Sequence, residues 1–339
     1  MDAVIREAWY VAAWDHEVQG EALFERQIIG QSLLFYRTAD GTVVALSNKC
    51  CHRHAPLVLG RREGDCVRCM YHGLKYDATG RCVEIPGQQA IPAAVRIRSY
   101  PVIERRRWIW VWMGEAAPAD PDTLPDTFSL ADPAWRMKPG YLHYAANHHL
   151  ISDNLLDFSH LSYVHAGTLG GTPQIAEVRA KMERLARGVR LRREVRDSVP
   201  APNHVQFGAR GRVDRWWVYD YVLPGILLLE SGVKPAAQDA SGGPTLRFHS
   251  CQALTPESDT TTHYFFAQAH GFALEDGQVT EALHQGLLAA FDEDRRMIEA
   301  QQRLIERTER QEMLGLPIDA ALGAYRRLYE QALRSDAAG

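Results

Sequence analysis

The 339-residue chain carries a formal net charge of −4, with 38 Lys and Arg residues against 42 Asp and Glu residues. Hydrophobic residues make up 46% of the chain and charged residues 24%, which is the composition of an ordinary globular protein. A nucleic-acid-binding protein usually shows an excess of basic residues, so we expect no nucleic-acid partner.

No segment predicts membrane insertion or secretion. The opening stretch MDAVIREAWYVAAWDHEV has early acidic residues and no apolar core followed by a small-residue cleavage site. The longest strongly apolar segment, YVLPGILLLES, contains a proline and is far shorter than the roughly 20 residues that a membrane span needs. We therefore expect a cytoplasmic protein whose six cysteines bind metal or stay free rather than form disulfides.

The sequence pattern changes near residue 117. Before it, QSLLFYRTADGTVVAL predicts two strands around a turn at residues 39–41, and RRWIWVWMG predicts a strand with Trp108, Trp110 and Trp112 on one face. The Pro- and Asp-rich segment GEAAPADPDTLPD then resembles an inter-domain connection. We predict an α+β protein with a β-rich domain over residues 1–117 and an α+β domain over residues 118–339.

The second domain is expected to combine strands with two helices. RWWVYDYVLPGILLLE and LRFHSCQAL are strand-like runs. HLISDNLLDFSHLSYVH predicts one helix, with Ser152 as its N-cap and Gly167 soon after its end. From about Thr280 to about Arg310, a second helix is indicated by apolar residues at helical spacing, namely Leu283, Leu287, Phe291, Ile298 and Ile305.

Two short Cys–His pairs form the first candidate metal site. They are Cys50-x-His52 and Cys69-x-x-His72, separated by residues 53–68. Two cysteines and two histidines can bind zinc tetrahedrally, or a Rieske [2Fe–2S] cluster in which two histidines replace two cysteines on one iron. The spacing alone does not decide between these metals. The alternative is a set of unconnected buried cysteines and surface histidines.

The second candidate site lies in the first predicted helix. Asn154, Asp157 and His160 follow one another at i, i+3 and i+6 and therefore share a helix face, whereas His165 lies off that face unless the helix bends or ends. A polar, solvent-facing helix surface is the alternative, but four apolar residues leave no clean polar side: Leu155, Leu156, Phe158 and Leu161. Buried polar groups of this kind are costly unless they are paired or bind metal.

A 2-His-1-carboxylate site for iron needs one carboxylate in addition to the two histidines. Asp157 is one candidate. Asp294 is favoured because it interrupts the apolar stripe of the second helix, and a carboxylate at a core position needs a cation. The other nearby acidic residues lie off that stripe: Asp292, Glu293 and Glu299.

Beyond these patterns, the chain resembles a known family over almost its whole length. CCHRHAPLVLG and GDCVRCMYHGLKYDATGRCVEIPGQ closely resemble the Rieske signature of ring-hydroxylating oxygenases, with Cys51 where proline is usual. The motifs N-x-x-D-x-x-H-x₄-H and F-x-E-D-x-x-x-I-E-x-Q resemble the catalytic domain of the vanillate O-demethylase and dicamba monooxygenase group. The resemblance implies an all-β Rieske domain followed by a catalytic domain of antiparallel sheet covered by helices.

The resemblance also assigns roles to residues. It implies that a [2Fe–2S] cluster is bound by Cys50, His52, Cys69 and His72, and that mononuclear Fe(II) is bound by His160, His165 and Asp294. In this family the residue at Asp157 links the Rieske histidine of one subunit to the iron ligand of the next, which implies a head-to-tail homotrimer. Asn154 would lie beside the iron, and Gln252 matches a position that lines the substrate pocket. Four further residues are interpreted as neighbours rather than ligands: Cys51, His54, Cys66 and Cys82.

The implied activity is that of a terminal oxygenase that uses O₂. The sequence has neither a glycine-rich dinucleotide motif nor a Cys-x₄-Cys-x₂-Cys run, so electrons are expected from a separate NAD(P)H-dependent reductase, with or without a ferredoxin. The family suggests O-demethylation of a methoxylated aromatic acid to a phenol and formaldehyde. Ring dihydroxylation, N-demethylation, methyl hydroxylation and a non-catalytic zinc or cluster electron carrier remain alternatives.

The substrate pocket is only partly predictable. Its expected walls are the two strand-like runs, and its expected lid is the glycine-rich segment HAGTLGGTPQ. Trp216 and Trp217 alternate across a strand, so at most one of them can face the pocket.

Overall fold

The computed structural model describes residues 4–169, 175, 177–237, 243–308 and 313–338. These residues form two compact units, which we describe separately. The first unit comprises the chain up to Leu124 together with Thr255–Ser258, and the second comprises Pro125–Leu254 and the residues from Asp259 onward. The division at Leu124 falls within the Pro- and Asp-rich segment. The domain boundary predicted at residues 117/118 remains a prediction.

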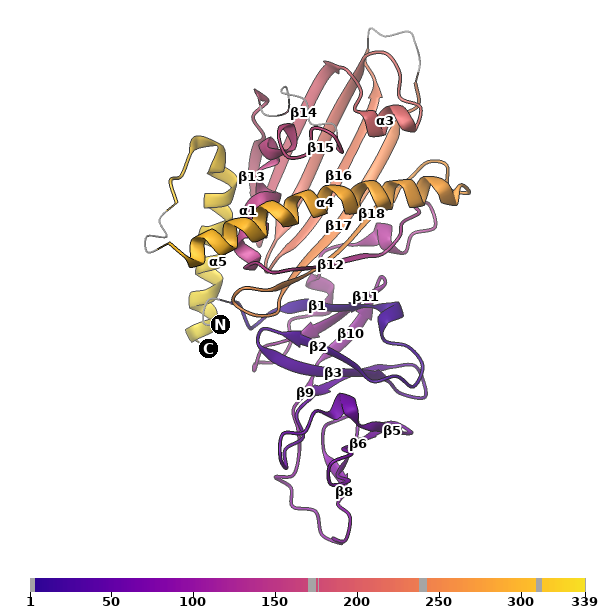
Figure 1. The fold of residues 1–339 in the computed structure, drawn as a ribbon, viewed down its shortest axis with the longest axis vertical. Coiled ribbons are helices and arrows are strands. Elements are labelled where there is room, and N and C mark those ends of the chain that lie inside the picture. The colour runs from indigo at the N-terminus through magenta and orange to yellow at the C-terminus, as the bar shows by residue number, and fades with distance from the viewer. Residues whose placement is uncertain (1–3, 170–174, 176, 238–242, 309–312, 339) are drawn as a thin grey trace. The chain divides into compact units, whose positions relative to one another are not determined.

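The first unit is built from three antiparallel sheets of short strands, in the orders β1-β11-β10, β2-β3-β4-β9 and β5-β6-β7-β8 (Figure 1). The strands are β1 (Trp9–Trp14), β2 (Phe24–Ile28), β3 (Gln31–Arg37), β4 (Val43–Ser47), β5 (Arg61–Glu63), β6 (Cys66–Arg68), β7 (Lys75–Tyr76), β8 (Cys82–Glu84), β9 (Ser99–Tyr100), β10 (Val102–Arg105) and β11 (Trp108–Trp112). Short 3₁₀ turns occupy Asp15–Glu17, Leu57–Leu59 and Pro121–Thr123.

Tryptophan pairs hold β1 and β11 together. Trp9 lies opposite Trp112 and Trp14 lies opposite Trp108, with ring centroids 5.6 and 5.5 Å apart. Every residue of both strands is buried. Aromatic pairs across strands add stability beyond the area that they bury. The hairpin predicted around residues 39–41 is β3–β4, in which Arg37 pairs with Val43.

The second unit contains one seven-stranded antiparallel sheet in the order β12-β18-β17-β16-β15-β14-β13, covered by helices. Its strands are β12 (Gly140–Tyr144), β13 (Lys181–Leu185), β14 (Gly188–Ser198), β15 (Val213–Val222), β16 (Ile226–Pro235), β17 (Leu246–Pro256) and β18 (Thr262–His270). Its helices are α1 (His148–Leu156), α3 (Pro202–Gln206), α4 (Gly277–Glu306) and α5 (Ala320–Ala338), with 3₁₀ turns η4 (Phe128–Leu130), η5 (Phe158–Ser162) and η6 (Pro317–Asp319). The predicted α+β fold is confirmed.

The run RWWVYDYVLPGILLLE is a hairpin rather than one strand. It turns at Leu223 and Pro224 between β15 and β16, because proline has no backbone N–H to donate within a central strand. In the resulting register Trp217 lies opposite Ser231, which lies opposite Phe248 on β17. This register brings residues of three strands to one point on the sheet.

The prediction of one continuous helix through His165 is wrong. Helix α1 ends at Leu156, because Asp157 is extended (φ −121°, ψ 105°) and its carboxylate caps the next turn by accepting from the Ser159 N–H at 2.8 Å. The N-cap of α1 is Asn147, not Ser152, and its side chain accepts from the amide N–H two residues on. The hydroxyl of Ser152 instead donates back into the helix.

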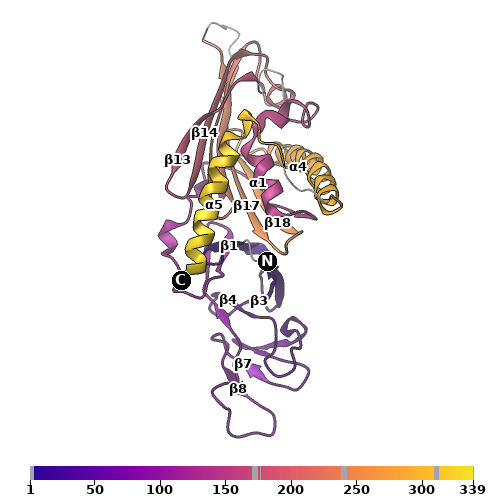
Figure 2. The same cartoon turned by 90° about the vertical axis from the view of Figure 1, so that its left-hand side faces the viewer.

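Helix α4 crosses the sheet, and α1 lies on the same face (Figures 1 and 2). The predicted stripe of α4 is largely confirmed, because four of its members are buried: Leu283, Leu287, Phe291 and Ile298. The helix begins at Gly277, with Asp276 as N-cap, and ends at Glu306, whereas the predicted end near Arg310 lies outside the described residues. Among the described residues, no helix combines the length and apolarity that crossing a membrane requires.

Helix α5 had no counterpart among the predicted elements. It packs against α1 and β14. The Tyr325 hydroxyl donates to the Pro224 carbonyl at 2.8 Å, and the Tyr329 hydroxyl lies 3.1 Å from His148 Nε2. This helix therefore fixes the start of α1 and the β15–β16 turn.

Candidate functional site

Two loops of matching conformation carry the predicted cluster ligands. Cys50 and His52 follow β4, while Cys69 and His72 lie between β6 and β7. In each loop the amide of the cysteine donates to the carbonyl five residues on, at 3.0 Å in the first loop and 2.8 Å in the second. The carbonyl of each cysteine accepts from the amide four residues on, at 2.9 Å in both.

The fourth residue after each cysteine has a left-handed backbone. Gly73 has φ 79° and His54 has φ 57°. Glycine adopts this conformation freely, whereas a residue with a Cβ atom is strained there. The imidazole of His54 is exposed. The two loops thus share one backbone conformation, with glycine at the left-handed position of one loop and histidine at that of the other.

The four predicted cluster ligands separate into a sulfur side and a nitrogen side. Cys50 and Cys69 are 1% and 2% exposed. His52 and His72 are exposed, and their ring centroids lie 4.5 Å apart. A buried pair of cysteine sulfurs beside an exposed pair of imidazoles fits a Rieske cluster, in which cysteines hold one iron and histidines the other.

The side chain of Tyr76 contacts the cysteine sulfurs of the first loop. Its hydroxyl is 3.1 Å from Cys50 Sγ and 3.3 Å from Cys51 Sγ. Burial raises the pKa of Tyr76 far above its usual value, so the phenol stays protonated and can donate to a thiolate. Cys51 therefore shares a partner with Cys50 although its side chain is exposed.

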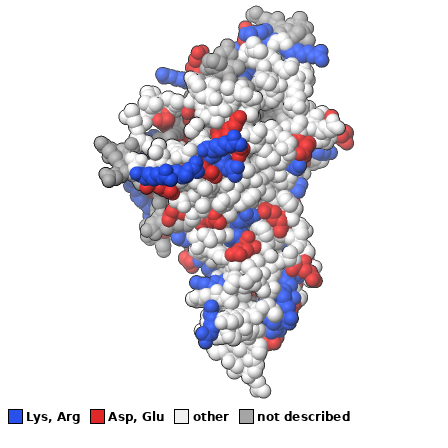
Figure 3. Space-filling model, in the orientation of Figure 1, with Lys and Arg blue, Asp and Glu red and all other residues white. Residues whose placement is uncertain are grey.

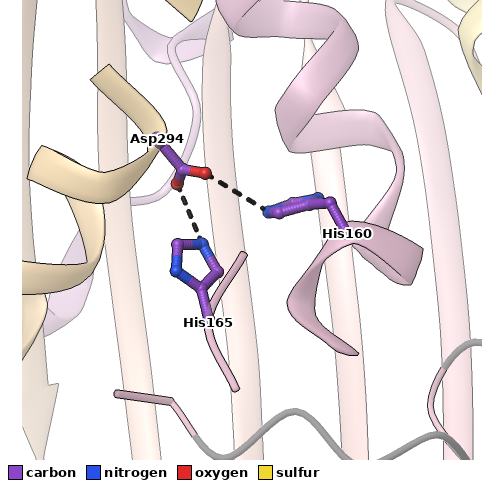
Figure 4. Close-up of side chains that lie close together, drawn as sticks. All are labelled: His160, His165 and Asp294. Carbon is purple, nitrogen blue, oxygen red and sulfur yellow. Dashed lines mark hydrogen bonds and ion pairs between the residues drawn. The ribbon is translucent and has the colours of Figure 1, made fainter. Parts of the chain in front are cut away.

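The predicted iron ligands meet in the second unit. Asp294, from α4, points toward His160 on η5 and toward His165 beyond it (Figure 4). Asp294 Oδ2 lies 3.1 Å from His165 Nε2, and Asp294 Oδ1 lies 3.7 Å from His160 Nε2. One ligand atom from each of the three residues lies within 4.8 Å of the others.

The other ring nitrogen of each histidine is engaged, which leaves Nε2 for a metal. His160 Nδ1 lies 2.5 Å from the Asp157 carbonyl oxygen, and His165 Nδ1 lies 2.8 Å from Glu293 Oε2. Such contacts set the tautomer and orient the ring of a metal-binding histidine. The donor set therefore fits a divalent iron with open positions.

Charges around the site act differently on the two histidines. Burial lowers the pKa of His160 despite the opposing effect of Asp294. Burial also acts to lower the pKa of His165, but the carboxylates of Asp294 and Glu293 outweigh it and raise that pKa. On the nitrogen that faces away from the site, His165 has a carboxylate partner whereas His160 has a carbonyl, which makes His165 the more basic ligand.

Several predicted and unpredicted residues surround this cluster. Asn154 Nδ2 donates to Asp294 Oδ1 at 3.0 Å, so Asn154 lies beside the three-residue cluster. The Asp157 carboxylate accepts from Ser159 and does not belong to the three-residue cluster. Glu293 lies off the apolar stripe of its helix, as the sequence indicated, yet its carboxylate contacts His165. In the sequence, only its position next to Asp294 could have indicated that Glu293 contacts the site.

The three-residue cluster opens into a cavity of about 110 Å³. Gln252 lies on its wall, as does Trp217, while Trp216 is not among the lining residues. Much of the predicted lid, residues 170–174, lies outside the described residues. The remaining walls are mostly apolar, and include Leu155, Phe158, Leu161, Leu169, Leu227, Leu229, Phe248, Leu287 and Phe291.

Asp292 offers a contrast with Asp294 two residues later. Its carboxylate pairs with Arg295 and Arg296, at 2.5 and 2.6 Å. Basic side chains gather over the C-terminal half of α4 on the face shown in Figure 3. Asp292 therefore belongs to the charged outer surface of α4, as its position off the apolar stripe predicted.

Comparison with known proteins gives consistent matches over the whole chain. Residues 8–101 match the model of the Rieske [2Fe–2S] domain, and residues 144–335 match that of the vanillate O-demethylase oxygenase C-terminal domain. The iron–sulfur subunit of the toluene-4-sulfonate monooxygenase system of Comamonas testosteroni is 44% identical, with 99% of each chain covered. A vanillate O-demethylase oxygenase subunit of a Pseudomonas species is 34% identical over 92% of this chain and 97% of its own length.

Solved structures agree with these matches. The crystal structure of dicamba monooxygenase bound to dicamba superimposes with a TM-score of 0.90 at 31% identity, covering 99% of this chain and 100% of that one. The structure of dicamba monooxygenase with non-heme iron and dicamba gives a TM-score of 0.83 at 30% identity, with 99% of each chain covered.

The matching loops predict unequal responses to substitution at their two left-handed residues, Gly73 and His54. Gly73→Ala is expected to destabilise the first unit by about 1–2 kcal/mol or more, because the left-handed backbone disfavours a Cβ atom, and the added atom would lie 2.6 Å from Pro86 Cγ. His54→Gly is expected to change stability by less than about 1 kcal/mol, with any gain coming from relief of backbone strain. Thermal loss of the cluster's visible absorption measures both changes. A His54→Gly protein without that absorption at room temperature would show that the imidazole belongs to the site.

Asp294→Ala is expected to remove the mononuclear iron and all oxygenation while the cluster spectrum persists, because the cluster loops lie in the other unit. Asp292→Ala is the matched control and should change stability by about 0.5 kcal/mol or less and keep the iron. Metal analysis combined with visible spectroscopy distinguishes the two centres. Stoichiometric mononuclear iron with turnover in Asp294→Ala would contradict the assignment and favour Asp157 as ligand.

Proposed function

We propose a reaction for this chain on the premise that it belongs to the family of Rieske oxygenase components with a vanillate O-demethylase-type C-terminal domain. The chain is an oxygenase, and its cofactors are a Rieske [2Fe–2S] cluster and a mononuclear non-heme iron. The proposed reaction is hydroxylation of a methyl or methoxyl carbon carried by an aromatic acid.

The proposed ligands follow from the two donor sets. Buried sulfurs and exposed imidazoles support the cluster assignment of Cys50, His52, Cys69 and His72. Convergence of the Nε2 atoms on one buried carboxylate supports the iron assignment of His160, His165 and Asp294. The iron supplies O₂ activation when it is bound.

The observation that carries the proposal is that the three-residue cluster opens directly into a cavity with mostly apolar walls. Such walls accept an aromatic ring and exclude bulk water from the reacting carbon. One oxygen atom of O₂ enters a C–H bond of the substrate, and the other leaves as water with two electrons and two protons. On a methoxyl carbon the product is a hemiacetal, which separates into a phenol and formaldehyde.

Hydroxylation of an aryl methyl group is the second form of the same reaction. The relative at 44% identity is named for toluene-4-sulfonate, which carries a methyl group, whereas the vanillate enzyme is 34% identical. O-demethylation and methyl hydroxylation both require a methyl carbon near the iron and an acid group elsewhere in the cavity.

The chain's own residues orient the iron ligands. The Asn154 amide donates to Asp294, and Glu293 accepts from His165, while the Thr168 hydroxyl donates to the same Glu293 oxygen at 2.8 Å. Each contact restricts the rotation of a ligand side chain. Precise orientation of ligands is what tunes a metal site of this type.

Electrons are proposed to come from a separate reductase, with or without a ferredoxin. Several relatives are named as oxygenase components or as the subunit of a monooxygenase system. Those names imply that other proteins complete the electron supply in the relatives. We expect the same division here, with NAD(P)H as the electron source.

A homotrimer with head-to-tail contacts is proposed as the working assembly, with Asp157 linking the cluster of one subunit to the iron of the next. The Asp157 carbonyl contacts His160 Nδ1 and its carboxylate is partly exposed, so the residue connects an iron ligand with the outside of the unit. Heterologous contacts of this kind close into rings when the rotation permits.

The proposed reaction predicts products only from substrates that carry the methyl carbon. With a generic reductase, 4-methoxybenzoate or vanillate should release formaldehyde, or toluene-4-sulfonate should yield its hydroxymethyl derivative. Formaldehyde assay and mass spectrometry identify the products. Benzoate and benzenesulfonate, which lack the methyl carbon, are the controls, and a ring diol formed from either would favour ring dihydroxylation instead.

The bridging role predicts a selective effect of Asp157→Asn. Asparagine is as good an N-cap as aspartate, so η5 should persist, while loss of the charge should slow electron transfer to the iron by at least about 10-fold. Single-turnover reoxidation of the reduced cluster, with substrate and O₂ present, measures this rate.

Co-assembly provides an independent check of the same proposal. Asp294→Ala chains lack the iron site and Cys69→Ser chains lack the cluster, so each protein alone should be inactive. Mixed oligomers should regain activity if the cluster of one chain serves the iron of another. A fully active monomer would contradict the assembly.

A further inference from the structure

We propose that Arg215 anchors the acid group of the substrate, a sulfonate or a carboxylate, at the end of the cavity away from Asp294. The inference rests on the proposed function and adds the group that selects the substrate. Arg215 was not among the residues that sequence patterns singled out.

The strand pattern directs Arg215 into the iron cavity. Alternate residues of β15 share one face of the sheet, and Arg215, Trp217 and Tyr219 lie on the face that carries α1 and α4. Arg215 is only 3% exposed and lines the same cavity as the three-residue cluster. It is the one arginine among the lining residues of that cavity that the structure describes.

The separation between Arg215 and the iron ligands suits a small aromatic molecule. The ring of Phe158, two residues before His160, stacks on Tyr219 with centroids 4.2 Å apart. Tyr219 is four residues from Arg215, which is roughly 13 Å along a strand. The extended arginine side chain and one aromatic ring with a substituent at each end together span such a distance.

Arg215 remains a cation at this buried position. Burial lowers its pKa to about 10, which still leaves the guanidinium protonated at neutral pH. Burial and the nearby Arg215 together lower the pKa of His204 to about 3, so His204 is neutral beside it. A buried cation favours an anionic ligand, because a guanidinium forms two parallel hydrogen bonds to a carboxylate or sulfonate.

Polar groups with unused hydrogen-bonding capacity lie in the same cavity. Asn203 and His204, from the start of α3, both line it, together with Ser231 of β16. Among the described residues, Asn203 Oδ1 and His204 Nδ1 are buried and have no hydrogen-bond partner. Such atoms are costly unless a ligand satisfies them. An amide flip of Asn203 and the Nδ1–H tautomer of His204 would turn both into donors to an anion.

Gln252, the predicted pocket residue, is already engaged by protein neighbours. Its Oε1 accepts from the Tyr264 hydroxyl at 2.5 Å, and its Nε2 donates to Ser250 Oγ at 3.1 Å. Gln252 therefore shapes the wall, whereas Arg215 supplies the charge. Trp217 lines the same cavity, and its ring centroid lies 4.9 Å from the Arg215 Cζ atom, so the guanidinium lies against an aromatic part of the wall.

The test compares each anion with its neutral amide of nearly equal shape. Benzenesulfonate and benzenesulfonamide, and benzoate and benzamide, lack the reacting methyl carbon, so their binding does not depend on turnover. Isothermal titration of the holoenzyme without reductant measures the dissociation constants. Wild type is expected to bind each anion more tightly than its amide, and Arg215→Gln should weaken anion binding by about 10- to 100-fold while amide binding changes less than about 3-fold.

Two further variants make the result specific. Arg215→Lys keeps the positive charge but lacks the planar guanidinium, so it should show part of the preference for anions that Arg215→Gln loses. Arg193→Gln is the matched control, because Arg193 is a buried arginine of the same sheet that donates to the Ile175 carbonyl and does not line this cavity. It should keep the wild-type ratio of anion to amide affinity. Mononuclear iron content confirms that the second unit of each variant is assembled, because the three-residue cluster belongs to the same unit.

The binding experiment tests the role of Arg215 independently of the proposed hydroxylation. A wild-type protein that binds anion and amide equally, or an Arg215→Gln variant that loses both equally, would overturn the anchor. A preserved anion preference in a protein that hydroxylates no methyl or methoxyl carbon would leave the anchor standing and refute the reaction.

Discussion

The buried carboxylate of Asp294, held between two imidazole nitrogens, is the interaction on which the second unit depends. A carboxylate that is 4% exposed is costly unless a cation or hydrogen bonds compensate it. Its compensation comes from far along the chain, since His160 and His165 precede it by more than a hundred residues. Helix α4 must therefore cross the sheet at one fixed position, and its apolar stripe against the sheet provides that position.

The interruption at Asp157 is the second condition for the site. In one continuous helix His165 would point away from the face shared by Asn154 and His160. Because the chain is extended at Asp157 and starts a new turn at Phe158, both histidines reach Asp294. The same aspartate caps that turn with its side chain and holds His160 with its carbonyl. A small local change in backbone direction thus produces a three-residue ligand set.

The cavity combines charged groups of opposite sign with mostly apolar walls. The ligand set, whose carboxylate matches a divalent cation, and the buried guanidinium of Arg215 both line it. With Arg215 as the proposed anchor, such an arrangement selects a molecule by its length and by the sign of its charge. Wall residues such as Leu229 and Phe248 then contribute shape rather than charge.

Patterns in the amino-acid sequence indicate the features that depend on neighbouring residues. Residue types and short spacings indicated the two Cys–His pairs, and helical periodicity singled out Asp294 as a charge on an apolar stripe. Tertiary structure decided the rest: the end of α1 at Asp157, the hairpin at Pro224, the contact of Glu293 with His165 and the burial of Arg215 in the cavity. These features depend on contacts between segments far apart in the chain, or on the choice between a side-chain cap and one more helical turn. Local patterns carry no information about such contacts, because their free energy exists only once the sheet and its helices have assembled.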